Sequence, residues 1–215
     1  MRKYWFVRLT VLLILSALAS AKIETANRPA NSPVPDAVWQ VLDPKGYHVV
    51  LDDGTVACDI WLRKSVPSSG KKDVEGALYP QLASSTLVGV ISLSAGATDY
   101  RGEPVKAGFY TLRYELLPND GNHLGVAPNR DFLLLIPAAS DPDPNAQFKS
   151  DALVNLSRGA TGTPHPGPLS LVQTGSPNPG VAKDDQDHWV FSGKLTLASG
   201  EELPFGLIVK GTAQQ

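Results

Sequence analysis

Cysteine is nearly absent from this chain of 215 residues, in which Cys58 is the only one. One thiol cannot form a disulfide within the chain, so the fold depends on its hydrophobic core, and the chain is long enough to build one. In the strand expected over 55–63, Cys58 lies on the same face as Ile60 and Leu62, and Asp59 and Arg63 lie on the other face. A buried thiol behaves as a small hydrophobic side chain with a raised pKa, so we expect Cys58 to be an inert core residue.

Long hydrophobic runs are also missing, except at the N-terminus. The stretch from Leu9 to Ala21 is apolar or small, follows three positively charged residues and ends in Ala19-Ser20-Ala21. This pattern predicts a cleaved secretory signal peptide over residues 1–21, because a membrane-spanning helix needs about 20 apolar residues and different flanks. Lys22 stands where a lipoprotein would have its cysteine. We therefore expect a periplasmic or extracellular protein with no membrane association after cleavage, and the lack of disulfides favours a bacterial periplasm.

Concentrated positive charge is absent too. The chain has 19 Lys and Arg residues against 21 Asp and Glu, a formal net charge of −2. The expected leader removes positive charge only, so the mature chain is more acidic, which argues against nucleic acid as a partner. The phosphate-binding patterns G-x-x-x-x-G-K-[ST] and G-x-G-x-x-G do not occur, and we expect no cofactor.

Proline and glycine are plentiful, with 18 and 19 residues, and they leave little room for long helices. Between them lie short runs that are continuously apolar or that alternate between apolar and polar residues. The clearest such runs are 47–51, 55–63, 87–93, 109–116, 131–137, 189–191, 194–198 and 203–210. About eight to ten short strands with turns between them predict an all-β fold, an antiparallel β-sandwich with at most one or two short helices.

This pattern divides the chain into three parts. Residues 1–21 are the signal peptide, and residues 22–36, polar with three prolines, are predicted to be a flexible tether. Residues 37–215 are predicted to form a single β-sandwich domain with a loop-rich insertion around 140–188, the kind of region where function often lies. Within it, a short helix is expected from Ser150 to Arg158, ended by Gly159.

Residues 107–112 read Ala-Gly-Phe-Tyr-Thr-Leu, an Ala-Gly-x-Tyr-x-Leu motif. The motif resembles a hairpin of many exported bacterial β-sandwich proteins, among them Ig-like modules and secreted families of unknown function. Gly108 permits a tight entry into the strand, while Tyr110 and Leu112 lie on one face of it. The resemblance implies a sandwich architecture and a bacterial source, and it carries over no catalytic residue because the motif serves folding.

Metal-ligand patterns are weak. None of the four histidines stands at a zinc-ligand spacing from another. Asp120, His123 and Asp131 lie in or beside a loop rich in Asn, Asp and Gly, which could hold a hard cation. The same residue types dominate ordinary turns, so the turn interpretation is favoured and no metal is expected.

Trp61 is the best candidate for stacking a ligand. It alternates with Asp59 and Arg63, and a flat ring flanked by hydrogen-bonding groups could form a binding platform for a glycan. The alternative, which we favour, is that Trp61 is covered, because large aromatic side chains are mostly buried. The candidate ligand-binding residues are therefore Asp59, Trp61, Arg63 and His123.

Catalytic patterns are missing as well, since the chain has no Gly-x-Ser-x-Gly elbow. We expect an exported, non-catalytic binding or accessory module whose ligand is a protein or a glycan. Two alternatives stay open. One is a hydrolase with its site in the loops 117–131 and 140–188, and the other is a carbohydrate-binding module that uses Trp61.

Overall fold

The computed structural model describes residues 20–118 and 129–213. In these residues the strands are β1 (Lys22–Asn27), β2 (Lys45–Val50), β3 (Val56–Leu62), β4 (Leu87–Leu93), β5 (Gly108–Leu116), β6 (Asp131–Pro137), β7 (Pro168–Val172), β8 (Gly180–Lys183), β9 (Trp189–Thr196) and β10 (Glu202–Lys210). The helices are α1 (Asp36–Val41), α2 (Ser150–Thr161) and the 3-10 turn η1 (Ala138–Ser140). Every ladder between these strands is antiparallel. The predicted all-β fold with eight to ten strands and few short helices is confirmed.

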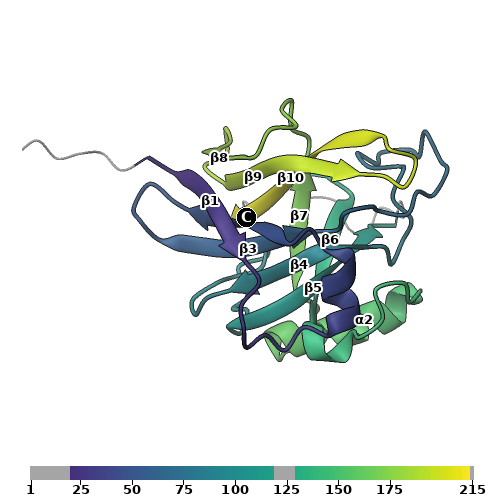
Figure 1. Cartoon of the computed structure of the whole chain (residues 1–215), viewed down its shortest axis with the longest axis horizontal. Helices are drawn as coiled ribbons and strands as arrows, with labels where there is room; N and C mark the ends of the chain where they lie inside the picture. The colour runs from purple at the N-terminus through teal and green to yellow at the C-terminus, as the bar shows by residue number, and fades with distance from the viewer. Residues whose placement is uncertain (1–19, 119–128, 214–215) are drawn as a thin grey trace, which may run out of the picture.

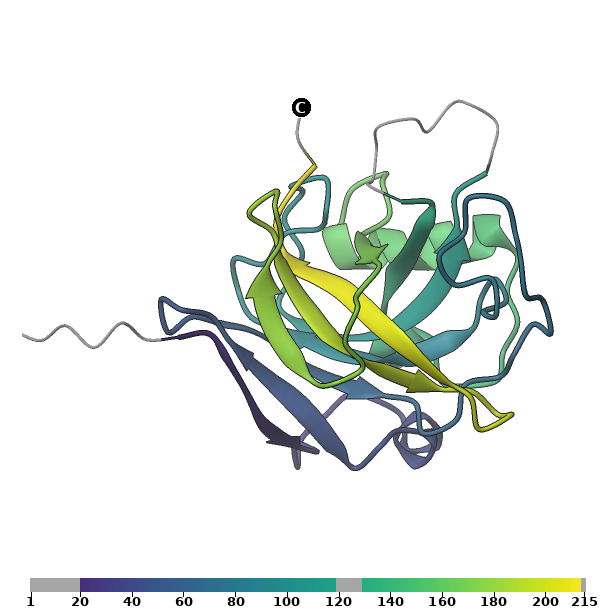
Figure 2. The ribbon, with the colours of Figure 1, turned by 90° about the horizontal axis from the view of Figure 1, so that it is seen from above.

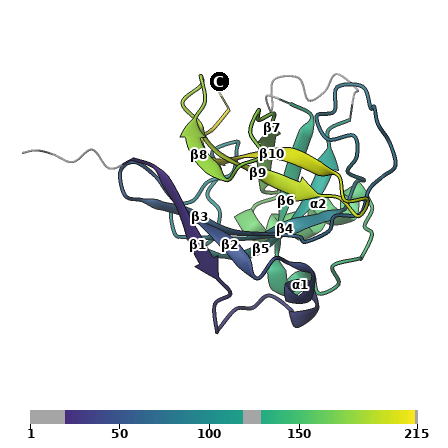
Figure 3. The same ribbon diagram turned by 45° about the horizontal axis from the view of Figure 1, so that its top comes forward.

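The ten strands form one nearly closed sheet in the order β1-β2-β3-β4-β5-β6-β7-β10-β9-β8. β7 joins the two halves of this sheet, since Ser170 pairs with Phe132 of β6 and Leu171 pairs with Leu207 of β10. Strands β8, β9 and β10 consequently lie across the half formed by β1 to β6 (Figures 1 and 3). The predicted layers are thus two parts of one continuous sheet.

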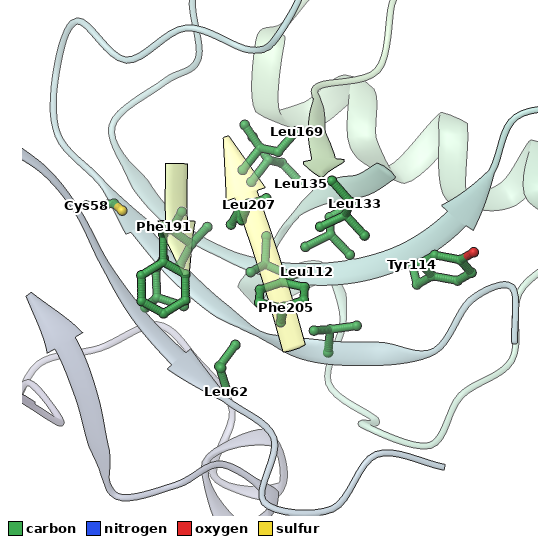
Figure 4. Close-up of a cluster of buried hydrophobic side chains, with 14 of the residues drawn as sticks. Cys58, Leu62, Leu112, Tyr114, Leu133, Leu135, Leu169, Phe191, Phe205 and Leu207 are labelled. Carbon is green, nitrogen blue, oxygen red and sulfur yellow. The ribbon is translucent and has the colours of Figure 1, made fainter. Parts of the chain in front are cut away.

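The main core lies between the two halves of the sheet. Figure 4 shows apolar side chains from both halves pointing toward one another, with Leu112 and Leu133 facing Phe205 and Leu207. These side chains come from the alternating positions that the sequence pattern assigns to one strand face. Cys58 is 1% exposed within this core, which confirms its expected burial, and that burial raises the pKa of its thiol.

The N-terminal segment differs from the flexible tether that we predicted for 22–36. Residues 22–27 form β1, which pairs with β2 from Lys22 opposite Val50 to Asn27 opposite Lys45. The three prolines of the segment follow β1, so they do not interrupt its ladder. The buried side chains of Ala26 and Val34 then fix the segment to the domain, because both contribute to an apolar cluster under α1.

Two helices cover the outer face of the sheet, the face that points away from the main core. α1 lies on β3 and β4 (Figure 3), and α2 lies along β6 (Figure 2). α2 starts at Ser150 as expected but continues past Gly159 to Thr161, and it ends at Gly162, whose φ of 72° suits the left-handed cap. No helix in the described part of the chain is long and apolar enough to cross a membrane.

Candidate functional site

Trp61 lies on the outer face of β3 and is only 1% exposed. The Trp39 ring of α1 meets it edge-on, with ring centroids 5.3 Å apart and an interplanar angle of 85°. Phe109 packs on it at 6.4 Å between centroids. The covered interpretation of Trp61 is confirmed, and an open platform for a glycan at this ring is wrong because α1 occupies the space that a sugar would need.

The two polar neighbours of Trp61 are engaged separately. Asp59 lies opposite His48 on β2, and its carboxylate is 2.5 Å from Nδ1 of that histidine. Arg63 donates from Nη1 to the Pro144 carbonyl at 3.0 Å and from Nη2 to Oδ1 of Asn145 at 2.7 Å. The structure therefore does not bring Asp59, Trp61 and Arg63 together as one open site.

Of the three weak metal candidates, Asp120 and His123 lie outside the described residues. Asp131 is fully buried, and its carboxylate accepts hydrogen bonds from the backbone N–H groups of Leu78 (2.7 Å) and Tyr79 (3.0 Å) and from the Tyr114 hydroxyl (2.7 Å). Burial, together with the bond to Asp131, raises the pKa of Tyr114. Asp131 thus anchors the segment that precedes β4. The described residues contain no group of three or more His, Cys, Asp and Glu side chains placed to hold a metal ion.

A buried ion pair fixes the segment that leads into α2. Nε and Nη2 of Arg113 donate to the two carboxylate oxygens of Asp141 at 2.8 and 2.7 Å. The remaining N–H groups of Arg113 donate to the carbonyls of Ser85, Ala146 and Asp143 at 2.7 to 2.8 Å. All five donors of the guanidinium are therefore used. Arg113 holds this segment against β5 and has no donor left for a ligand.

Beside this ion pair, a cavity of about 450 Å³ lies between α2 and the outer face of β5, β6 and β7. We call it the α2 cavity. Among the described residues, its lining is formed by Tyr100, Arg101, Glu115, Leu116, Leu117, Pro118, Phe132, Leu134, Ser150, Asp151, Val154, Pro166, Pro168 and Ser170. Most of these side chains are apolar, and they come from the sheet, from the first turns of α2 and from the loops before β5 and β7. The lining thus combines segments that are far apart in the sequence.

The register of the sheet places three lining residues in one row across the cavity floor. Glu115 of β5 lies opposite Phe132 of β6, and Phe132 lies opposite Ser170 of β7. Alternation along each strand puts Leu134 and Pro168 in the next row on the same face. The floor is therefore an aromatic and apolar surface with one polar side chain on each side.

The two polar side chains of this row are buried. Ser170 is 1% exposed, and its hydroxyl has no hydrogen-bond partner among the protein groups that the structure describes. Glu115 is 6% exposed, and one carboxylate oxygen accepts a hydrogen bond from the Ser150 hydroxyl at 2.5 Å. The Ser170 oxygen itself has almost no accessible surface, so this hydroxyl is packed within the sheet and is not open to the cavity.

Arg101, the basic side chain in the described lining, already has acidic partners. Arg101 donates from Nη2 to Asp99 at 2.9 Å, to Glu103 at 3.4 Å and to the Pro166 carbonyl. Glu115 and Asp151, on the opposite side, form no ion pair with any lysine or arginine of the described residues. The described lining is therefore mostly apolar, and its two acidic side chains come from β5 and from the first turn of α2.

Sequence reasoning placed a possible site in the loops 117–131 and 140–188, and the α2 cavity draws part of its lining from both regions. It missed Glu115 and Ser170 as site residues, since each is an ordinary outward position of a strand. No family model, no curated protein and no solved structure matches this chain.

Proposed function

We propose that this chain is an exported, non-catalytic binding protein that holds a small, mostly apolar molecule in the α2 cavity. The observation that carries the proposal is the cavity of about 450 Å³, whose described lining is mostly apolar and includes the Glu115 carboxylate and the Ser150 hydroxyl. Sites for small ligands typically measure about 300 to 1,000 Å³ and combine an apolar lining with a few polar groups that orient the ligand.

Binding accounts for this lining better than hydrolysis does. A hydrolytic site needs a nucleophile within reach of a general base, most often a histidine. The side chains that line the α2 cavity in the described part of the chain include neither histidine nor cysteine. We therefore favour a binding role over the hydrolase alternative.

Nile red, a neutral dye that fluoresces in apolar surroundings, tests the binding role. We expect the chain that begins at Lys22 to bind the dye in a saturable way. Val154→Trp fills the cavity from α2 and is expected to weaken binding at least tenfold. Asn155→Trp, one position along on the exposed side of α2, is the matched control and should bind as the wild type does. Equal binding by all three proteins would refute the α2 cavity as the site.

Export is supported by the N-terminal sequence and requires its own test. We expect bacterial expression of the full chain to yield a periplasmic or secreted protein whose N-terminal residue, determined by sequencing, is at or near Lys22. Recovery of the intact chain beginning at Met1 from the cytoplasm would contradict export. This result would leave the binding role of the α2 cavity unaffected.

A further inference from the structure

His188 is buried at the end of the turn between β8 and β9. Its Nδ1 is 3.0 Å from Oδ2 of Asp184, and its Nε2 is 3.0 Å from the backbone carbonyl oxygen of Thr212, which follows β10. We propose a pH-dependent switch in which the protonated His188 ring holds residues 211–213, the C-terminal segment, on the domain and releases them when it loses a proton. This inference does not depend on the proposed binding function.

Each ring nitrogen of His188 faces an atom that only accepts hydrogen bonds, since neither a carboxylate nor a backbone carbonyl has a proton to donate. A neutral imidazole carries its proton on one nitrogen, so it donates to Asp184 or to Thr212 but not to both. The cation donates to both. Loss of one proton therefore breaks one of the two bonds and leaves a lone pair facing an oxygen inside the protein, which is costly.

The bond to Thr212 is the one that the neutral ring loses. Burial opposes the charge of Asp184, but hydrogen bonds from the backbone N–H groups of His188 and Gln186 and from the His188 ring outweigh it and hold the pKa of Asp184 below its ordinary value. Asp184 is thus an anion where histidines titrate, at about pH 5 to pH 8. A charged acceptor binds a proton more strongly than a carbonyl does, so the remaining proton stays on Nδ1.

The other charged and titratable groups around His188 do not change charge in this range. The ring of Tyr100 meets the imidazole edge-on at 5.5 Å between centroids, and burial raises the pKa of its phenol. The nearby charged side chains on the β8–β9 turn, on the loop of Tyr100 and at the end of β10 are paired with one another, as Lys183–Asp187, Arg101–Asp99 and Lys210–Asp53. His188 is therefore the group that makes this region sensitive to pH.

The C-terminal segment depends on few contacts. It follows Lys210, the last residue of the ladder between β9 and β10, and so lies outside the sheet. The Ala213 N–H donates to the Tyr100 carbonyl at 2.8 Å. Gly211 has a φ of 142°, and a Cβ at this position would overlap the His188 ring, so its backbone packs directly on the imidazole. Loss of the bond to Thr212 frees this segment without opening a strand pair.

NMR spectroscopy of the chain that begins at Lys22 tests the switch between about pH 5 and pH 9. The ¹⁵N signals of the His188 ring report which nitrogens are protonated. The methyl signals of Thr212 and Ala213, which are observable at every pH, report whether the segment is held, with the peptide Gly-Thr-Ala-Gln-Gln as the reference for the released state. We expect both nitrogens to be protonated at low pH. As Nε2 loses its proton, the ratio of held to released segment should fall at least tenfold.

Three variants separate the charge from the packing. His188→Gln offers an N–H to the Thr212 carbonyl without titrating, so the segment should stay held at every pH. Gly211→Ala pushes the backbone off the ring and should release the segment at every pH. His48→Gln is the matched control, because His48 also pairs with an aspartate, Asp59, but far from the segment, and the wild-type transition should be unchanged. Circular dichroism verifies that each variant is folded.

Several results would overturn the switch. One is a His188 ring with an unprotonated nitrogen at every pH, and another is a ring that stays doubly protonated up to pH 9. A segment that remains held while Nε2 loses its proton contradicts it as well, as does a transition in His188→Gln equal to that of the wild type. Each of these results leaves the Nile red test of the α2 cavity unaffected.

Discussion

The Arg113→Met variant tests how much the buried ion pair between Arg113 and Asp141 contributes to the stability of the protein. Arg113 is fully buried, and its removal leaves the Asp141 carboxylate inside the protein with the Thr111 hydroxyl, at 2.6 Å, as its remaining side-chain partner. Breaking a buried ion pair by removing one partner typically costs about 3–5 kcal/mol in the free energy of unfolding. For a domain of this size that corresponds to a fall in Tm of about 6–20 °C.

Urea denaturation followed by tryptophan fluorescence measures this change. Arg158→Met is the matched control, because Arg158 is exposed on α2 and bonds only its helix neighbour Asn155 in the described structure. Exposed substitutions of this kind usually change stability by no more than about 0.5 kcal/mol. We expect the control to unfold at nearly the same urea concentration as the wild-type protein.

A double variant shows whether the loss comes from the ion pair. Arg113→Met combined with Asp141→Leu removes both charges, and replacing a buried pair by apolar residues is often close to neutral. The double variant should therefore be clearly more stable than the sum of the two single losses predicts. The reasoning is refuted if Arg113→Met loses less than about 1 kcal/mol, or if the two single losses simply add.

Four further outcomes follow from the buried side chains. Ser170→Ala should raise the free energy of unfolding by up to about 1 kcal/mol, measured in urea, because it removes a buried hydroxyl without a partner. Cys58 should not react with Ellman's reagent at pH 8 until the protein is unfolded, since burial keeps its thiol protonated and inaccessible. Burial raises the pKa of Tyr79 from 10.0 to about 12. The stability that the protonated Tyr79 side chain contributes should therefore be complete below about pH 10 and be lost as the pH rises toward 12, and a falling Tm over this range would show the loss. Trp61→Ala should cost about 3–5 kcal/mol, detected as a lower urea midpoint, because the ring fills the space under α1.

The strands were predictable where one face of a strand contacts the core and the pattern alternates. Tyr110, Leu112 and Tyr114 lie on the core side of β5 as their spacing indicates. The strand β1 was not predictable in this way, because it has a polar composition and only Ala26 of its residues is buried. The position of β1 depends on its pairing with β2. Pairing between separate segments of the chain leaves no signal in the sequence of β1 itself.

The outward side of β5 shows why the site was harder to predict than the fold. Thr111, Arg113 and Glu115 alternate with apolar residues, which is typical of a strand face in contact with solvent. In the structure all three are buried, because α2 and the segment before it cover this face. Only the pairing of β5 with β6 and of β6 with β7 brings Glu115 into one row with Ser170.

The buried polar residues on this covered face differ in how completely they are hydrogen-bonded. Arg113 and Asp141 satisfy each other and the surrounding carbonyl groups, so their burial is explained by the fold itself. Glu115 and Ser170 both line the α2 cavity, and of the two only the Ser170 hydroxyl has no partner among the described protein groups. Burial of the Ser170 hydroxyl without a partner costs stability, and the expected gain in the free energy of unfolding on Ser170→Ala tests this reasoning.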